Sequence, residues 1–498
     1  MATQETTIND RREIFGWAMY DWANSAFSTT VVTVFFGPYL TNLAKEASAA
    51  TGGFLYLAGL PIKFDSYFAY CVSISVLLQA GFLPVLGALA DYSHLRKQLL
   101  MFFSTVGAIT TILMFFIGPT GYWLGGALFI LANLTFGASI VFYNSYLPSI
   151  ASEDQRDRVS AHGFALGYIG GGILLLLNLV LYLFKGAIGI DSAMVARISL
   201  ASAGIWWLGF SFITFNALHP RHAVRPLPKD QSYITIGYKQ LSDLVQLPIG
   251  LTTCLMLLPL VGIPILILLH ASTTVILLPV IGPIIVLIMF MTHKSKSMPE
   301  AVKYLASYLL YNDGIQTVIA VSTIFASQEL NMSDTNRILV VLMIQFVAYG
   351  GAYGFAWIAQ RTGTKNAIII SLIVWSFVTI YAWLGMKSMA IVFGMEQRQF
   401  EFWILAFVVA LVLGGSQALS RSLFAQMIPK DQEAEFFSFY EISERGTSWS
   451  GPLIFGLVNQ RYGSLRLGIL SVIIFFIIGL ILLPLVNVEK AKEQARQN

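Results

Sequence analysis

Apolar residues gather into windows of about 20 along this chain, separated by short polar stretches. A helix of that length crosses the hydrocarbon core of a bilayer, so each window predicts a transmembrane helix. We therefore expect an all-α integral membrane protein with twelve such helices, six on each side of a basic central segment. The predicted helices are 14–40, 65–91, 98–118, 122–149, 159–184, 194–217, 301–327, 336–360, 366–386, 400–427, 436–458 and 465–487.

The central segment holds one further apolar stretch. Residues 247–292 contain no Asp, Glu, Lys or Arg, repeat the pattern "LLPLVGIP" and "LLPVIGP", and divide at "HAST" (270–273). We expect an extra hairpin here, giving about 14 membrane segments, although its prolines also allow a re-entrant pair. The predicted domains are a six-helix bundle at 1–218, a central cytoplasmic linker at 219–300 that contains the hairpin, and a second six-helix bundle at 301–498.

Composition agrees with a membrane protein. The 498 residues are 56% hydrophobic and only 11% charged, whereas a soluble domain carries about 25% charged residues. The formal net charge of +4 is too small to suggest a nucleic-acid partner. Lys and Arg are concentrated on one side of the predicted helices, so the positive-inside rule places both termini in the cytoplasm.

The two halves of the chain carry similar motifs in the same order. Parallel repeats of this kind place a substrate path at their interface near the middle of the membrane. Three pairs of motifs occur in the same order: "YDWANS" (20–25) with "YNDGIQT" (311–317), "GALADYSHLRK" (87–97) with "AWIAQRTGTK" (356–365), and "NSYLPSIASEDQRDR" (144–158) with "FAQMIPKDQEAEF" (424–436).

The second of these pairs resembles the signature of the major facilitator superfamily, G-x-x-x-D-[RK]-x-G-[RK]-[RK]. The first copy departs from it at Tyr92 and the second at Gln360. In this superfamily the acidic residue bonds across the interface between the halves and holds one access state closed. The resemblance therefore implies a conformational gate, and its matching positions are Gly87 and Asp91 in the first copy and Arg361 and Gly363 in the second.

Longer motifs narrow the resemblance to one branch. "YDWANSAF", "YNDGIQTV", "GGSQALSRSLFAQMIP" and "EFFSFYEISERGTSWSGPLIFG" are similar to the unknown major facilitator family, whose fungal relatives are autophagy-related vacuolar amino-acid effluxers. The resemblance covers 12–218 and 301–487 but not the apolar hairpin. It implies a secondary transporter that works by alternating access, with amino acids as candidate substrates and export as the direction. It also implies a protein of the bacterial cytoplasmic (inner) membrane.

Two acidic residues stand inside predicted helices. Counting along each helix places Asp21 roughly 10 Å and Asp313 roughly 18 Å from its end. A carboxylate at such depth must be paired, hydrated or protonated, so it usually marks a function. In the resembled fold the first helix of each half lines the central cavity. We therefore expect both to face one aqueous path and to couple transport to protons, with the more central Asp313 having the stronger effect. The alternative is a structural carboxylate bonded to Asn, Ser or a helix terminus.

Other polar residues could complete a substrate or proton pathway. Arg421 could pair with a carboxylate, bind the carboxylate of a substrate, or extend to the headgroups. Glu441 and Arg445 share one helical face and could neutralise each other, whereas Glu444 has no basic residue four positions away. Polar side chains also hold membrane helices together, which is the alternative for the remaining candidates. These are Tyr20, Asn24, Ser25, Asn144, Asn312 and Gln316.

The expected partners are a small solute, protons and membrane lipids, for a chain that functions as a monomer. We expect no cofactor, no metal site and no enzymatic activity, and the lack of a Walker sequence excludes ATP as the direct energy source. "GYIGGG" (167–172) follows no strand, so we interpret it as a close helix contact rather than a nucleotide loop. A membrane enzyme acting on a lipid-like substrate and a non-transporting sensor remain alternatives. The sequence does not distinguish protons from sodium, or import from export.

Overall fold

The computed structural model describes residues 8–57, 60–64, 67–221, 298–445 and 450–497. The hairpin predicted at 247–292 lies outside the described residues, as does most of the linker. The two six-helix bundles and the total of 14 membrane segments therefore stay predictions. We refer to residues 8–221 as the first half and to residues 298–497 as the second half.

The first half is helical apart from one short hairpin, in which β1 and β2 pair in antiparallel fashion. Its opening segment changes from α-helix to π-helix and back without a break. Its elements are α1 (Arg11–Ala26), the π-helix η1 (Phe27–Phe35), α2 (Phe36–Ala47), β1 (Phe54–Leu57), β2 (Leu60–Lys63), α3 (Tyr67–Asp91), α4 (Arg96–Leu113), α5 (Tyr122–Ser145), α6 (Leu147–Ile150), α7 (Arg156–Leu183), α8 (Lys185–Ile188) and α9 (Ser192–Ala217).

The second half is also helical apart from one short hairpin. In this hairpin the strands β3 and β4, of two residues each, pair before the fourth long helix of the half. Its elements are α14 (Pro299–Gln328), α15 (Asp334–Thr362), α16 (Thr364–Leu384), β3 (Ile391–Val392), β4 (Met395–Glu396), α17 (Gln397–Gln426), α18 (Glu433–Arg445), α19 (Ser450–Tyr462), α20 (Leu465–Ser471), α21 (Ile473–Leu482) and α22 (Val488–Gln497).

The described part of every apolar window predicted outside the hairpin lies mainly on one of these helices or on neighbouring ones. Among the described residues, eight helices are long and apolar enough to cross a membrane. Three other long elements, α1, α14 and α18, carry the buried acids Asp21, Asp313 and Glu441. Each acid lowers the mean hydropathy of the helix that carries it.

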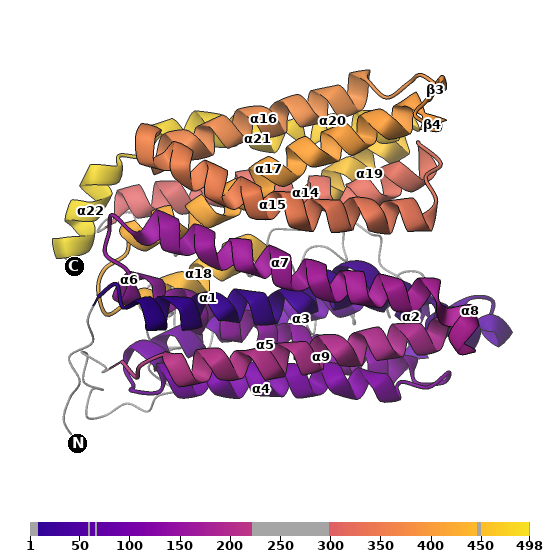
Figure 1. Ribbon diagram of the computed structural model, residues 1–498, viewed down its shortest axis with the longest axis horizontal. Coiled ribbons are helices and arrows are strands. Elements are labelled where there is room, and N and C mark those ends of the chain that lie inside the picture. Colours follow the sequence, from indigo (N-terminus) through magenta and orange to yellow (C-terminus); the bar gives the residue numbers. More distant parts are fainter. Residues whose placement is uncertain (1–7, 58–59, 65–66, 222–297, 446–449, 498) are drawn as a thin grey trace.

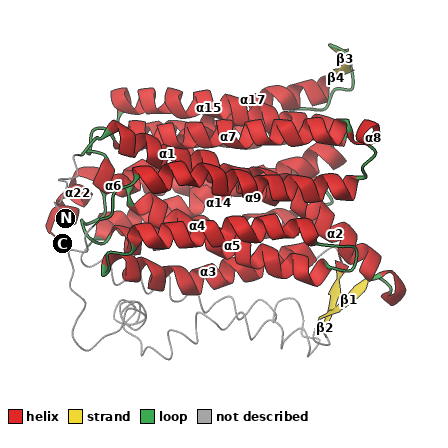
Figure 2. Ribbon diagram, turned by 60° about the horizontal axis from the view of Figure 1, so that its bottom comes forward, coloured by secondary structure: helices red, strands yellow, loops and turns green. Residues whose placement is uncertain are grey.

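The long helices run side by side along the long axis of the molecule (Figure 1). The halves meet where α7 packs against α15 and α17 and where α18 packs against α3 and α5. The start of α1 and the helix α22 lie at one end, which we call the termini end. Helix α8 and both β-hairpins lie at the opposite end, which we call the far end (Figure 2).

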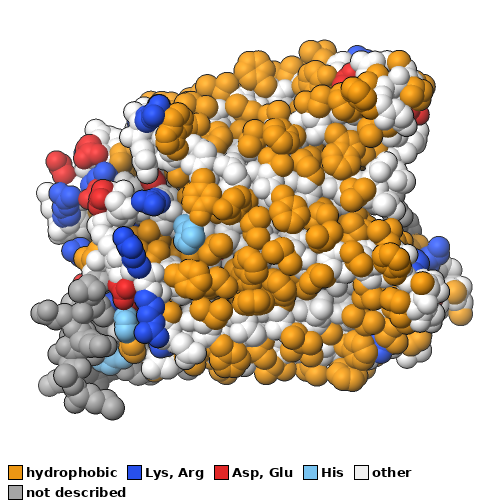
Figure 3. Space-filling model, in the orientation of Figure 1, with side chains coloured by type: hydrophobic (Ala, Val, Ile, Leu, Met, Phe, Trp, Pro, Cys, Tyr) orange, Lys and Arg blue, Asp and Glu red, His pale blue; other side chains and the backbone are white. Residues whose placement is uncertain are grey.

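Hydrophobic side chains cover the broad face between the two ends, whereas charged side chains gather at the ends (Figure 3). Large apolar side chains are well exposed on helices of both halves, among them Phe212, Phe377 and Ile481. Such an apolar surface is stable in contact with lipid tails rather than with water. The chain is an integral, multi-pass membrane protein.

The glycine run 167–172 lies where α7 crosses α1, as the close-contact interpretation predicts. A Cβ atom on Gly170 would lie 2.5 Å from the carbonyl oxygen of Trp22, and one on Gly167 would lie 2.7 Å from Ser25 Oγ. Glycine therefore lets the two helices approach closely.

Gly170→Ala is expected to lower stability by about 1–3 kcal/mol, because the added methyl group meets backbone that cannot rotate away. The matched control is Gly209→Ala in α9, where a Cβ atom meets nothing within 4 Å. Thermal unfolding in detergent measures both. Equal midpoints for the two variants would contradict the packing role of this run.

Candidate functional site

An ion pair joins the halves in the interior of the protein. Arg421 Nη1 of α17 donates to Asp21 Oδ2 of α1 at 3.1 Å, across 400 positions of sequence. The hydroxyl of Tyr143 donates to the same carboxylate oxygen at 2.7 Å. Asp21 is 7% exposed and Arg421 3% exposed, so each charge depends on its partner in place of water.

The guanidinium of Arg421 is held on all sides. Its Nε donates to Ser160 Oγ and its Nη2 to the carbonyl oxygen of Ser160, both at 2.9 Å. Nη1 also donates to Asn144 Oδ1 at 3.3 Å. The rings of Phe164 and Trp17 lie 4.1 and 4.8 Å from the guanidinium carbon, within cation–π range. Of the roles predicted for Arg421, the structure shows the one in which it pairs with a carboxylate.

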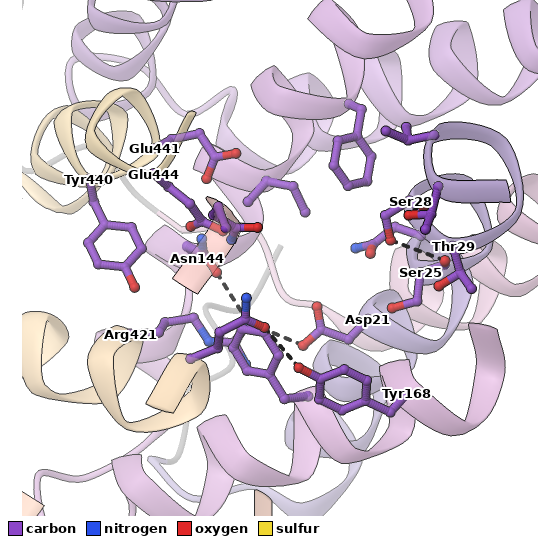
Figure 4. A pocket seen from close by; sticks show the side chains of 18 of the residues that line it. Asp21, Ser25, Ser28, Thr29, Asn144, Tyr168, Arg421, Tyr440, Glu441 and Glu444 are labelled. Atoms are coloured by element: carbon purple, nitrogen blue, oxygen red, sulfur yellow. Dashed lines mark hydrogen bonds and ion pairs between the residues drawn. The ribbon is translucent and has the colours of Figure 1, made fainter. Parts of the chain in front are cut away.

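A cavity of about 350 Å³ borders this ion pair, and both halves line it (Figure 4). Helices α1, α5 and α7 and the π-helix η1 contribute from the first half, and α14, α15, α17 and α18 from the second. Eight of the residues predicted from sequence line it. They are Asp21, Asn24, Ser25, Asn144, Gln316, Arg421, Glu441 and Glu444.

Helix α18 presents two acids to the cavity, and they lie on the opposite side from Ser25, Ser28 and Thr29 (Figure 4). Glu441 is fully buried. Glu444 accepts a hydrogen bond from the hydroxyl of Tyr308 at 3.2 Å. The ring of Tyr308 stacks on that of Tyr440, with centroids 4.3 Å apart, and both tyrosines line the cavity.

The π-helix η1 forms the wall of the cavity toward the far end. Thr33 Oγ1 donates to the carbonyl oxygen of Ser28 at 2.8 Å, five residues earlier, which fits the wide π-turn. Thr29 accepts a bond from Gln345 Nε2 of the second half at 3.2 Å. π-Helical turns are frequent at functional sites. Here the wide turn brings a row of hydroxyl groups to the cavity.

The termini end is closed by a carboxylate at a helix start. Asp91, the last residue of α3, accepts from the backbone N–H of Ala434 at 3.1 Å and of Glu435 at 2.7 Å. Arg96 Nη2 bonds Asp91 at 3.0 Å and Glu433 at 3.2 Å. A negative charge at a helix N-terminus is favourable because the first N–H groups there have no partner within the helix.

Two further contacts close the same end. Thr364 Oγ1, at the start of α16, donates to Asp157 Oδ2 of α7 at 2.6 Å. Lys492 of α22 bonds Glu153, in the loop before α7, at 2.8 Å. Although partial burial disfavours its ionised form, the hydrogen bond and charge of Lys492 lower the pKa of Glu153. Three separate contacts therefore tie the halves together here.

The far end is hollow instead. A second cavity of about 1110 Å³ lies between the halves there, and Thr33 borders both it and the central cavity. Its walls include Arg197 of the first half and Thr323 and Ile338 of the second. The central cavity and the far-end cavity thus share Thr33 as a lining residue, whereas the halves are bonded to each other at the termini end, by contacts that we call the floor.

A comparison with known protein families identifies the family of this chain. The family described as "Vacuole effluxer Atg22 like" matches residues 9–496. The chain belongs to this Atg22-like family.

Curated relatives of this Atg22-like chain cover it nearly end to end. The uncharacterized MFS-type transporter YxiO of Bacillus subtilis is 26% identical over 97% of this chain and 96% of its own length. Autophagy-related protein 22-1 of Penicillium rubens is 23% identical over 99% and 92%, respectively. Because these relatives are bacterial and fungal, the inner-membrane location and the cytoplasmic termini stay predictions.

Solved structures share the fold of the Atg22-like chain. The major facilitator superfamily proton:xylose symporter XylE superposes with a TM-score of 0.61 at 11% identity, over 94% of this chain and 93% of its own. The human organic anion transporter MFSD10 gives 0.58 at 12% identity, over 95% and 99%. The fold is that of the major facilitator superfamily. The matched proteins are named as transporters, a symporter and effluxers, which favours transport over enzymatic chemistry, as the sequence predicts.

One expectation for the Atg22-like chain is corrected by the structure: Asp313 is not among the residues that line the central cavity. It is 1% exposed, and its Oδ2 accepts from the backbone N–H of Gly451 in the first turn of α19 at 3.1 Å. A buried carboxylate bonded to a backbone N–H can be purely structural, so a role of Asp313 in proton coupling stays a prediction. Depth along α14 could be counted from the sequence, but the direction in which the side chain points could not.

Other predicted residues also lie beside the cavity rather than in it. The Tyr20 hydroxyl shares a hydrogen bond with Ser104 Oγ at 2.7 Å. Asn312 donates to the carbonyl oxygen of Glu444 at 3.2 Å. The side chain of Arg445 lies outside the described part of the chain, so its pairing with Glu441 stays a prediction.

The four predicted gate residues separate into two pairs. Gly87 and Asp91 lie against the start of α18, as the gate requires. Arg361 instead stacks over Trp357 of its own helix at 3.8 Å, and Gly363 is an exposed turn residue with φ +87°. Where the signature has an acidic residue, this copy has Gln360. The corresponding contact between the halves is made by other residues.

Sequence reasoning missed several residues of the site. Their side chains are polar or aromatic residues within apolar helices, which is the signal that could have marked them. Their partners lie far away in the sequence, so no local pattern indicated which residues they contact. Those that contact the ion pair, line the cavity or close the floor are Trp17, Arg96, Tyr143, Asp157, Ser160, Tyr308, Gln345, Thr364, Gln417, Glu433 and Tyr440.

Proposed function

We propose that the chain is a secondary active transporter that moves a small solute by alternating access, coupled to protons, with amino acids as candidate substrates and export as the direction. The observation that carries the proposal is the Asp21–Arg421 ion pair, which joins the halves beside a cavity that both of them line. An ion pair in this position both fixes one access state and contains a titratable group.

Protonation of Asp21 is the proposed coupling step. A neutral Asp21 no longer compensates the buried guanidinium of Arg421, so the contact between α1 and α17 weakens. Arg421 then becomes available to a carboxylate of the solute, which a guanidinium binds strongly. Opening of the floor between α3 and α18 follows, and release of the solute and the proton restores the ion pair.

The lining supports a zwitterionic solute. Hydroxyl and amide groups of Ser25, Ser28, Gln316 and Gln345 line the cavity, and they can donate to a carboxylate or accept from an ammonium group. The family description "vacuole effluxer" supports export.

The test uses purified protein in liposomes that contain a pH dye. A panel of amino acids is added outside, with and without an imposed pH gradient and in sodium or potassium buffer. Solute-dependent proton movement that is independent of sodium, and absent from protein-free liposomes, is the expected result. Solute movement that requires sodium would overturn proton coupling. Silence across the panel from folded protein would overturn the amino-acid assignment.

A further inference from the structure

We propose that the hairpin of β3 and β4 inserts its apolar tip into the lipid at the far end, at the boundary between headgroups and acyl chains, and anchors that end of the second half in the bilayer. The hairpin belongs to residues 385–396, which connect α16 to α17, two helices long and apolar enough to cross a membrane. This surface lies outside the central cavity, so the inference does not depend on which solute is transported.

The tip of the hairpin exposes several large apolar side chains. Phe393 is 85% exposed, Ile391 71% and Met389 66%. Figure 1 shows the hairpin at the far end, on the side of the second half that is turned away from the first half. Large apolar side chains that are exposed together mark a surface that a protein or a membrane covers. The tip therefore requires a partner.

The turn of the hairpin holds a phenylalanine in an unfavourable backbone conformation. Phe393 and Gly394 form a two-residue loop between the paired strands, with φ values of +50° and +81°. A loop with positive φ at both positions favours Asn-Gly, and a bulky residue rarely adopts this conformation. The turn itself thus gives no reason for a phenylalanine here, whereas an apolar partner of the ring does.

The base of the hairpin is bonded to the rest of the second half. Glu396 bonds Arg398 at the start of α17, and Arg398 Nη1 donates to the carbonyl oxygen of Glu329 at 3.2 Å. The backbone N–H of Arg398 donates to the carbonyl oxygen of Ser388 at 3.0 Å. Because these bonds fix the base beside the start of α17, the exposed tip has a defined position relative to the membrane helices.

Helix α17 continues the apolar surface of the tip into the membrane. The ring of Phe393 packs against that of Phe400, with centroids 5.4 Å apart. Ile404 and Phe407 follow Phe400 at four and seven residues, which places them on the same helical face, and both are well exposed. An exposed apolar face of a membrane helix contacts lipid. The tip is thus an extension of a lipid-facing surface.

Helix α16 leads to the tip from the other side. Phe377, Tyr381 and Leu384 have the same spacing along their helix, and all three are exposed. Figure 3 shows hydrophobic side chains as far as the corner where Figure 1 places the hairpin. Aromatic side chains are typical of the level at which a bilayer meets water. The lipid that covers both helix faces is therefore the partner that fits the tip.

The test uses nitroxide labels on single cysteines, with all other cysteines replaced by alanine, in protein reconstituted into phosphatidylcholine liposomes. Labels at Met389 and Phe393 report on the tip, a label at the exposed Phe377 on the lipid-facing side of α16, and a label at the exposed Gln328 on the end of α14. Collision with oxygen, which concentrates in lipid, is compared with collision with a nickel chelate, which stays in water. We expect the oxygen-to-nickel ratio at both tip positions to lie above that of Gln328 and below that of Phe377.

A variant assigns the insertion to the apolar ring. Phe393→Asn suits the turn, so the hairpin should stay folded. Insertion should weaken about tenfold or more, as the loss of one large apolar side chain from lipid predicts, and nickel collision at a label on Met389 should rise. The matched control is Tyr462→Asn at the end of α19, an aromatic residue that is 67% exposed but lies outside the hairpin. It should leave the collisions at Met389 unchanged.

The outcomes distinguish lipid from water and from protein. Tip labels that meet the nickel chelate as often as the label at Gln328 does would place the tip in water and overturn the inference. Protection from both reagents would overturn it too, and dipolar broadening between labels on separate copies would then identify a second copy of the chain as the partner. A lipid-like ratio that Phe393→Asn removes and Tyr462→Asn retains supports the inference, whether or not the liposomes show transport.

Discussion

Asp21→Asn is expected to abolish proton-coupled solute movement by the reconstituted protein. Asparagine keeps the shape of the side chain but leaves the guanidinium of Arg421 buried without its counter-charge. Removing one partner of a buried ion pair costs about 3–5 kcal/mol. Because that loss falls on the state with the closed floor, we expect a shift of about 100-fold or more toward opening at the termini end. The pH dye measures proton movement, and labelled solute measures exchange.

The matched control is Asp154→Asn, an exposed aspartate in the loop before α7, which should behave like the unaltered protein. The double variant Asp21→Asn, Arg421→Gln should recover much of the lost stability, because neither charge then remains buried alone. It should not recover proton coupling. An Asp21→Asn protein with unchanged transport rate and unchanged pH dependence would reduce Asp21 to a structural role.

Gly87→Ala is expected to open the floor by a steric route that involves no charge. A Cβ atom at this position would lie 2.6 Å from the carbonyl oxygen of Ala434 and 3.0 Å from the Cα of Glu435. Helices α3 and α18 must then separate where Asp91 bonds the start of α18. We expect transport to fall by about tenfold or more, since overpacking of this kind costs about 1–3 kcal/mol in the closed state. Initial rates in liposomes measure the effect.

The control for Gly87→Ala is Gly354→Ala in the middle of α15, where a Cβ atom meets nothing within 4 Å. Asp91→Asn should shift the protein in the same direction as Gly87→Ala, because it weakens the bonds to the helix start without adding bulk. If Gly87→Ala transports at the same rate as Gly354→Ala, the α3–α18 contact does not control the cycle.

The positions of the helices could be predicted from the sequence because hydropathy is a local property. The described part of each apolar window outside the hairpin lies mainly on helix, and the glycine run of α7 packs closely against α1 as its small residues suggested. Charges inside apolar segments also marked Asp21, Arg421 and Glu441 as unusual without any structure. Local signals of this kind are informative because lipid requires an apolar surface along the whole of a membrane segment.

The partners of those residues could not be predicted in the same way. Asp21 and Arg421 are 400 positions apart and meet only because α1 and α17 approach across the two halves. For Asp313, helical counting gave the depth but not the direction of the side chain, which bonds the backbone N–H of Gly451. Arg361 matches the signature motif yet stacks on Trp357, and the acid expected beside it is replaced by Gln360. Pairing depends on the packing of the halves, which no single segment specifies.

Distances across the two ends of the molecule test alternating access most directly. Spin labels would be placed at Leu95 and Lys430 for the termini end and at Ile188 and Phe393 for the far end, all exposed positions, with Cys71 and Cys254 replaced by alanine. On lowering the pH, or in Asp21→Asn, we expect the termini-end distance to lengthen and the far-end distance to shorten. Distances that stay fixed, or that lengthen together at both ends, would contradict it.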